Sequence, residues 1–334
     1  MKRSALMGAL AVAAAALVGA GTVGAAEVNM KIAHVVPQKA PRGQGAVLVA
    51  KMASEDKRCD IQAQDYPSAQ LGGTTDLIEG LQDGSIEMVI LPASFLVGFQ
   101  PLLGILDFPF FWPPEKDNLL EIHKGPAMKA LLATTDEIGV TSLSVWHTGY
   151  KTWTGNKPLN KYDNYAGITA RVMPSPVLKK QDELLGVKAV GMPFKETYSA
   201  LKNKSIDAQE NPITTSFFMK FHEVQTHMAL TNHGTLDQVI MVSKIWWDKL
   251  SADCRTAIGE AVDAGGKLTT DLTYSIIEAK AMGAFKAAGM EVVEVSPADF
   301  ADMKAKVLPG VEKFYVEETG ERGKMILEAF KKEM

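Results

Sequence analysis

Residues 168–212 read ITARVMPSPVLKKQDELLGVKAVGMPFKETYSALKNKSIDAQENP, and the fold follows from this stretch. The apolar run 168–172 is typical of a strand, and the Pro-Ser-Pro sequence after it favours the start of a helix. Apolar residues then recur at helical spacing up to Gly186, which suits a helix C-terminus. A short strand and a second helix over about 195–203 follow, before the polar end of the stretch. This strand, helix, strand, helix order indicates an α/β fold.

Arg171 is the residue of this stretch that most needs a partner, because its charge stands inside an apolar strand. A buried guanidinium is stable when an anion lies opposite it. Its planar fork fits a carboxylate or sulfonate through two parallel hydrogen bonds, and the amide of Asn211 offers a donor and an acceptor to the same ligand. The residues alone leave two interpretations open: Arg171 binds a ligand, or it pairs with an internal Asp or Glu.

Four motifs carry a resemblance to a known family. They are RVMPSP at 171–176, MPFKETYSAL at 192–201, QENP at 209–212 and FHEVQ at 221–225. With them the chain resembles the extracytoplasmic solute-binding proteins of TRAP transporters, above all the C4-dicarboxylate branch, over essentially the whole mature chain. The resemblance implies that Arg171 grips the ligand's carboxylate and that Asn211 supports it. It also implies a two-domain periplasmic binding protein fold, and delivery of the ligand from a cleft between the domains to an ion-gradient-driven membrane permease.

Residues 1–26 are typical of a secretory signal peptide. Lys2 and Arg3 form its basic region, 5–20 a short alanine-rich core, and small residues precede Glu27 for cleavage. A retained membrane anchor is the alternative. The apolar run is short for a spanning helix of about 20 residues, however, and no other stretch is long enough. We therefore expect an exported, periplasmic protein.

Composition argues against a nucleic-acid partner. Without Lys2 and Arg3, 33 basic and 39 acidic side chains remain, a net charge of −6. An anionic ligand must then be attracted by local cations rather than by the overall field. Cys59 and Cys254 would meet an oxidising compartment after export. The sequence leaves open whether they form a disulfide.

The segment 35–45 is a candidate wall of the cleft, because loops at the carboxyl ends of strands line ligand crevices in α/β folds. It follows a predicted strand, 28–34, and leads into a helix that ends near residue 57. His34 and Arg42 could supply positive charge to the cleft. The resemblance favours Arg42, because the family places a cation there, usually lysine in the dicarboxylate branch. The alternative is a solvated loop charge.

Lys151 is a further candidate cation, twenty residues before Arg171. The family commonly places a second cation there, facing the same cleft, and two cations could hold the two ends of a dicarboxylate. The alternative is a solvent-facing lysine. Trp146 and Phe194 are candidate apolar walls of the same cleft.

Three positions depart from the pattern of the dicarboxylate branch. Thr148 stands where an asparagine is common, and Ile213 and Gln238 stand where a large aromatic residue is expected. These departures leave the exact ligand open. A C4-dicarboxylate is our first expectation, with a sulfonate, keto acid, aromatic acid or sugar acid as alternatives.

The length predicts two domains, since about 300 mature residues exceed one hydrophobic core. We expect the first domain to comprise 27–148 and 237–276, and the second 149–236 and 277–334. A helical pattern over 251–289 would exceed roughly 50 Å, long enough to span both domains. The resemblance identifies it as a connecting helix and implies a hinge.

Enzyme signatures are the remaining test of function. The chain contains no G-x-S-x-G, no H-E-x-x-H and no P-loop, and its clustered histidines match no familiar zinc spacing. We predict a binding protein without catalysis, cofactor or metal; an exported enzyme on the same fold is the alternative. The predicted ligand site consists of Arg171, Asn211, Lys151, Arg42, Trp146, His34, Phe194, Thr148, Ile213 and Gln238.

Overall fold

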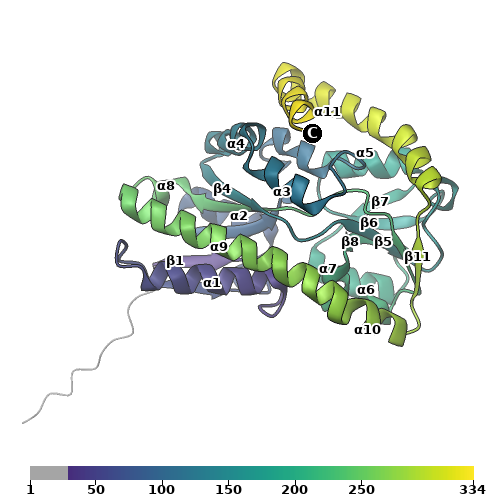
Figure 1. Ribbon diagram of the computed structural model, residues 1–334, viewed down its shortest axis with the longest axis horizontal. Helices are drawn as coiled ribbons and strands as arrows, with labels where there is room; N and C mark the ends of the chain where they lie inside the picture. Colours follow the sequence, from purple (N-terminus) through teal and green to yellow (C-terminus); the bar gives the residue numbers. More distant parts are fainter. Residues whose placement is uncertain (1–28) are drawn as a thin grey trace, which may run out of the picture.

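The computed structural model describes residues 29–334 and contains two sheets, which lie side by side in Figure 1. The signal peptide predicted at 1–26 lies outside the described residues. The first sheet has the order β2-β1-β3-β10-β4. β1 is parallel to β2 and β3, whereas β10 is antiparallel to both β3 and β4. Its strands are β1 (Met30–Ala33), β2 (Ala63–Tyr66), β3 (Met88–Pro92), β4 (Val140–Trp146) and β10 (Gln238–Ser243).

The second sheet has the order β11-β9-β5-β8-β6-β7. β6 is parallel to β7 and β8, and β5 is antiparallel to β8 and β9. The alternation predicted from 168–212 is confirmed, because β6, α5, β7, α6 and β8 follow one another there. The strands are β5 (Lys151–Gly155), β6 (Thr169–Val172), β7 (Lys188–Gly191), β8 (Ala208–Pro212), β9 (His227–Leu230) and β11 (Glu291–Glu294).

Helices cover both sheets, and Figure 1 shows α9 running along both of them. α9 and α10 are joined by one π-helical turn, Ile277–Ala281, and together they form the long helix expected from the sequence. Among residues 29–334, no helix combines the length and apolarity that crossing a membrane requires. The helices are α1 (Pro41–Glu55), α2 (Thr74–Asp83), α3 (Lys116–Lys124), α4 (Pro126–Ala133), α5 (Pro176–Leu185), α6 (Thr197–Lys202), α7 (Ile213–Phe218), α8 (Lys244–Trp247), α9 (Ala252–Ile276), α10 (Met282–Ala287) and α11 (Pro297–Glu333).

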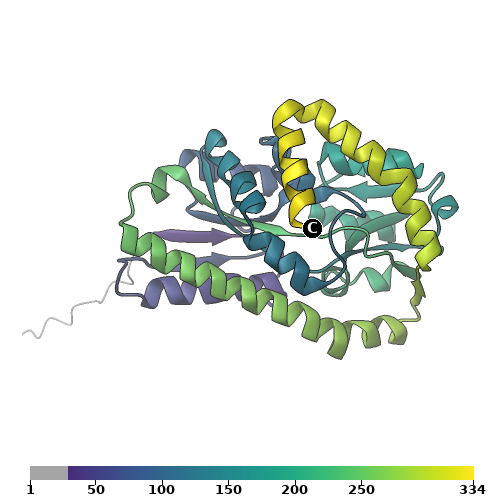
Figure 2. The same ribbon diagram turned by 45° about the horizontal axis from the view of Figure 1, so that its top comes forward.

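The chain passes between the sheets after β4, before β10 and along α9. The strands of each sheet come from the two segments expected for each domain, although the boundary itself stays a prediction. α11 was expected in the second domain, yet it packs on α5 and also on the first domain. The Tyr315 hydroxyl donates to the Leu102 carbonyl at 2.9 Å, and Trp112 meets Phe330 edge to face. Tyr315 precedes and Phe330 follows a bend of α11 at Gly320, where φ is 64° (Figure 2). The bend lets α11 make both of these contacts.

Three local expectations differ from the structure. α1 begins at Pro41, inside the predicted loop, because the fixed φ of proline suits the first helical position. Arg42 is therefore in a helical first turn. β5 was not predicted as a strand. The sequence predicts one helix over 213–225, whereas α7 ends at Phe218 and Lys220 adopts a left-handed conformation before a short 3₁₀ turn.

A disulfide joins Cys59 to Cys254, with their Cα atoms 4.9 Å apart. It links the segment after α1 to the first turn of α9, two helices that pack along each other in the first domain. The two cysteines, whose pairing the sequence left open, therefore form a disulfide.

Cys254→Ala is expected to lower the free energy of unfolding by about 2–5 kcal/mol, because the bridge closes a long loop in the unfolded chain. The partners are 195 residues apart. Thermal and denaturant unfolding under non-reducing conditions measure the change. Cys59→Ala should lower the free energy of unfolding by a similar amount, and the double variant should lose no more than either single variant. If the two single losses add in the double variant, packing of the side chains rather than the disulfide supplies the stability.

Candidate functional site

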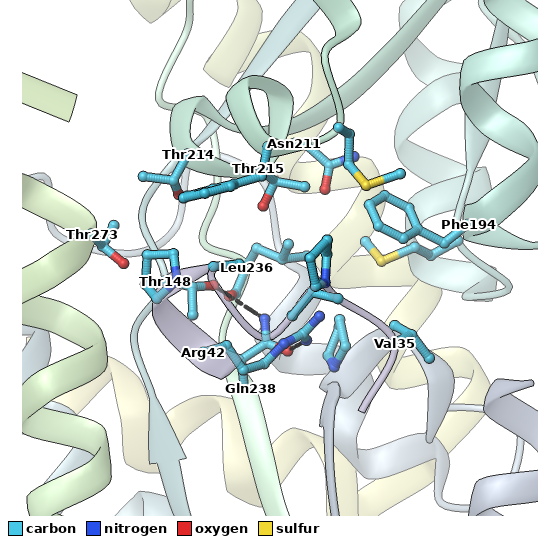
Figure 3. Close-up of a pocket in the computed structure, with 18 of the residues that line it drawn as sticks. Val35, Arg42, Thr148, Phe194, Asn211, Thr214, Thr215, Leu236, Gln238 and Thr273 are labelled. Carbon is cyan, nitrogen blue, oxygen red and sulfur yellow. Dashed lines mark hydrogen bonds between the residues drawn. The ribbon is translucent and has the colours of Figure 1, made fainter. Parts of the chain in front are cut away.

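A cavity lies between the two domains and takes its walls from both. The first domain contributes residues between 35 and 42, after β1, and the second contributes the ends of β6 and β8 and the start of α7. Figure 3 shows Arg42 and Gln238 on one side, opposite Asn211, Thr214 and Thr215. The carboxyl ends of parallel strands thus meet at the cavity, as in other α/β binding sites. The remaining lining residues are Val35, Val36, Pro37, Ala40, Pro41, Pro92, Phe95, Thr148, Arg171, Met173, Phe194, Phe218, Met219, Leu236 and Thr273.

Arg171 extends from β6 into this cavity and is 2% exposed. Its Nε and Nη2 each lie 3.4 Å from the carbonyl of Met192, and its guanidinium lies 5.5 Å from the centre of the Phe194 ring. Burial lowers its pKa to about 10. No Asp or Glu among residues 29–334 forms a salt bridge with it; Glu210, which attracts it electrostatically, is bonded to other groups.

Asn211 lies near the end of β8 and lines the same cavity. Its Nδ2 donates to Oε1 of Gln209 at 2.5 Å, and Gln209 donates in turn to Thr154 at 2.9 Å. This chain of side chains holds the Asn211 amide in place, with its oxygen toward the cavity in Figure 3. The amide can therefore orient a bound molecule beside Arg171.

Arg42 enters the cavity from the first turn of α1 and is 6% exposed. Burial lowers its pKa to about 9. Its Nη1 donates to Oε1 of Gln238, a neutral partner. Within the described part of the chain, no carboxylate forms a salt bridge with Arg42, and the cavity thus contains two buried guanidinium groups without a counter-anion.

Lys151 was expected in the cavity, but its ammonium lies elsewhere. It is fully buried and pairs with Oε1 of Glu210 at 2.8 Å. Glu210 also binds Nε2 of His233 at 2.6 Å and Nε2 of Gln181 at 2.9 Å. Burial alone would raise the pKa of Glu210, but Lys151 and His233 hold it well below its usual range. Because this carboxylate occupies Lys151, we remove Lys151 from the proposed ligand set.

Three other expected residues do not line the cavity. Trp146 packs against α9, where Gly265 and Gly266 leave room for its ring; a Cβ on either would lie within 2.8 Å of it. His34 binds Oδ1 of Asp65 at 2.9 Å. Ile213 joins the apolar cluster around Phe285.

α7 and the turn after it place four residues in the cavity that the sequence did not predict there, Thr214, Thr215, Phe218 and Met219. α7 begins directly after Asn211 and Pro212, so adjacency to the QENP motif was the available signal. This helix contains no charged residue, so its composition gave no reason to place it in the ligand site.

A second cluster of buried polar groups lies where the chain passes between the domains. Asp237 binds Nδ1 of His147 at 2.9 Å and Nε2 of His123 at 3.1 Å. His147 Nε2 reaches the hydroxyl of Tyr274 on α9 at 3.0 Å. Asp237 therefore ties together the segment after β4, the segment before β10 and, through His147, the long helix.

A sequence model of the family described as "Bacterial extracellular solute-binding protein, family 7" matches residues 32–318. The chain belongs to this family. It is 33% identical over 289 residues, 85% of each chain, to the C4-dicarboxylate-binding periplasmic protein DctP of Rhodobacter capsulatus. A TRAP periplasmic solute binding protein from Desulfovibrio salexigens with bound orotic acid has a TM-score of 0.88 and 31% identity, covering 92% of this chain and 98% of that one. Another, from Shewanella oneidensis with bound succinate, has a TM-score of 0.84 and 28% identity, covering 91% and 98%.

Membership in family 7 confirms the resemblance that the four sequence motifs carried. The chain is thus an extracytoplasmic solute-binding protein of the TRAP type, whose relatives bind small organic acids. Between residues 29 and 334, no group of three or more His, Cys, Asp or Glu is arranged to hold a metal ion.

Proposed function

We propose that this protein captures a small dicarboxylic acid, a C4-dicarboxylate by first preference, and delivers it to a TRAP permease with small and large membrane subunits. The observation that carries the proposal is the pair of buried guanidinium groups, Arg171 and Arg42, in one cavity. Neither is neutralised by a carboxylate in the described residues. A ligand with an anionic group at each end would provide both counter-charges, which buried arginines need.

The walls between these groups favour a short carbon skeleton. Phe95, Met173, Phe194 and Leu236 are apolar, as are half of the other lining side chains. A sugar acid needs hydrogen-bonding partners along its whole length, whereas the carbon chain of a diacid can pack against the apolar part of these walls. An aromatic acid is the second candidate, because Phe194 lies against Arg171 and could stack on a ring.

Closure of the cleft follows from the division of the site between the domains. Asn211 and Arg171 belong to the second sheet, whereas Arg42 and Gln238 belong to the first domain. A ligand that bridges them makes its full set of contacts when the domains are closed, and it stabilises that state by its differential affinity. Because the cavity lining contains no histidine, cysteine or carboxylate among the described residues, we propose capture without turnover.

A panel of acids tests the proposal, using thermal unfolding of the mature protein without residues 1–26. Succinate, malate and fumarate should raise the unfolding temperature, with about 2.7 kcal/mol of stabilisation at 100 times Kd. Succinamate, which replaces one carboxylate of succinate by a neutral amide, should have a much smaller effect. A shift with orotate or a sugar acid and none with the diacids would reassign the ligand. No shift with any small acid would contradict the proposed function.

A further inference from the structure

We propose that Gln238 and Thr148 are positioning residues that hold the guanidinium of Arg42 in one orientation and so set the ligand selectivity of the cavity without binding the ligand themselves. This inference rests on the proposed function, because it specifies how the second cation of the site acts.

The polarity of the Gln238 amide is set by the backbone. Its Nε2 donates to the carbonyl of Leu236 at 3.0 Å and to the hydroxyl oxygen of Thr148 at 3.1 Å. The Thr148 hydroxyl donates to the same carbonyl, which can only accept. The amide oxygen is left facing Arg42, and it accepts from Nη1. A flipped amide would place oxygen against the carbonyl and hydrogen against the guanidinium, so this orientation is enforced.

These bonds leave Gln238 and Thr148 without a free donor. Both amide hydrogens and the hydroxyl hydrogen are used, and the two side chains are 1% and 7% exposed. Arg42 differs, because a guanidinium carries five N–H donors and its bond to Gln238 engages one nitrogen. No other side-chain hydrogen bond of Arg42 is formed within residues 29–334. Arg42 is therefore the group that meets the ligand, and its two neighbours direct it.

The relay formed by Thr148 and Gln238 is anchored to the segments in which the chain passes between the two sheets. The two residues are next in sequence to His147 and Asp237, which bind each other at 2.9 Å. Successive side chains of extended backbone point to opposite sides. The hydrogen bond between Asp237 and His147 thus lies on one side of the crossing segments, and Thr148 and Gln238 lie on the cavity side. This hydrogen bond keeps Gln238 and Thr148 in register for Arg42.

Selectivity follows from the burial of Arg42. An acid with a second anionic group provides the missing counter-charge at this end of the cavity, whereas an acid with a neutral group leaves the buried cation uncompensated. A guanidinium held in one orientation can also bind a carboxylate through its fork, which a freely turning one does less well.

The test is a double-mutant cycle read by calorimetry with succinate and succinamate. Gln238→Leu should weaken succinate binding about 10-fold or more, and succinamate binding less than twofold. Gln238→Glu, nearly isosteric, should weaken succinate further because its carboxylate neutralises Arg42. In an Arg42→Met background, adding Gln238→Leu should change neither affinity more than twofold. Gln44→Leu, an exposed position on α1, is the matched control for the substitution itself.

Equal losses from Gln238→Leu with Arg42 present and in the Arg42→Met variant would overturn the proposal, since Gln238 would then act on the ligand directly or through the fold. Crystal structures of the unliganded wild type and Gln238→Leu give a ligand-independent readout. They should show the guanidinium displaced in the variant, and an unchanged guanidinium overturns the proposal. If wild-type protein binds neither acid, the dicarboxylate assignment fails, while the crystal structures still decide the role of Gln238.

Discussion

Arg171→Ala is expected to weaken binding of the organic acid by about two to four orders of magnitude. Removing one partner of a desolvated charge pair costs about 3–5 kcal/mol, and every 1.4 kcal/mol is tenfold in affinity. Arg171 is 2% exposed, and its one acceptor in the described part of the chain is the Met192 carbonyl at 3.4 Å. Almost all of its compensation must therefore come from the ligand. Isothermal calorimetry with the acid that gives the largest thermal shift measures the loss.

Two further variants sharpen this prediction. Arg171→Lys should also bind poorly, because an ammonium cannot reproduce the paired hydrogen bonds of the fork. Arg171→Met should bind poorly and yet be at least as stable as the wild type without ligand, since it removes a buried cation that forms no salt bridge within residues 29–334. Arg322→Ala, at an exposed pair with Glu137, is the control. Unchanged affinity in Arg171→Ala would refute the role of this arginine.

Glu210→Gln is expected to lower the free energy of unfolding by about 3–5 kcal/mol, because it leaves the buried ammonium of Lys151 without its counter-charge. Glu210 is 2% exposed and binds Lys151, His233 and Gln181 at 2.6–2.9 Å. Denaturant unfolding of the unliganded protein measures the loss. The matched control is Glu183→Gln, at a surface pair whose glutamate side chain is 69% exposed, and it should cost less than about 1 kcal/mol.

The carboxylate of Glu210 should also make the stability of the protein fall as the pH falls. Despite burial, Lys151 and His233 hold the pKa of Glu210 below its ordinary value of 4.5. The unfolded state then takes up the proton first as the pH falls, so the stabilisation is complete above about pH 4.5 and is lost below it. The difference in stability between wild type and Glu210→Gln should shrink as the pH falls below about 4.5. A constant difference down to about pH 3 would contradict this assignment.

The sequence predicted the parts of the fold that local pattern determines. The strand and helix order of 168–212 depends on apolar spacing, a Pro-Ser-Pro break and a terminal glycine, all of which act within a few residues. The long helix over 251–289 has the same basis. β5 was missed because Lys-Thr-Trp-Thr-Gly looks polar, and it is stable as a strand because partners far along the chain surround it.

The cavity was predicted less completely, because a sequence does not say which way a side chain points. Arg171, Asn211, Arg42, Phe194, Thr148 and Gln238 all line it. Lys151 was the informative failure. Its charge suggested a second cation for the ligand. Glu210, the neighbour of Asn211 in the sequence, instead forms a buried salt bridge with Lys151, so the ammonium is already paired before a ligand binds. Arg42 has no such ion-pair partner within the described residues, and this difference appears in the three-dimensional arrangement alone.

The place of β10 in the first sheet has a consequence for how the chain folds. β10 lies between β3 and β4, yet its residues follow the whole run that builds most of the second sheet. The first domain therefore cannot finish folding until residue 243 is available. Contacts between such distant segments form slowly, because the loop must close before the pairing stabilises it. A chain that works outside the cytoplasm must first cross a membrane, and slow completion of this sheet would keep it longer in an unfolded, transportable form.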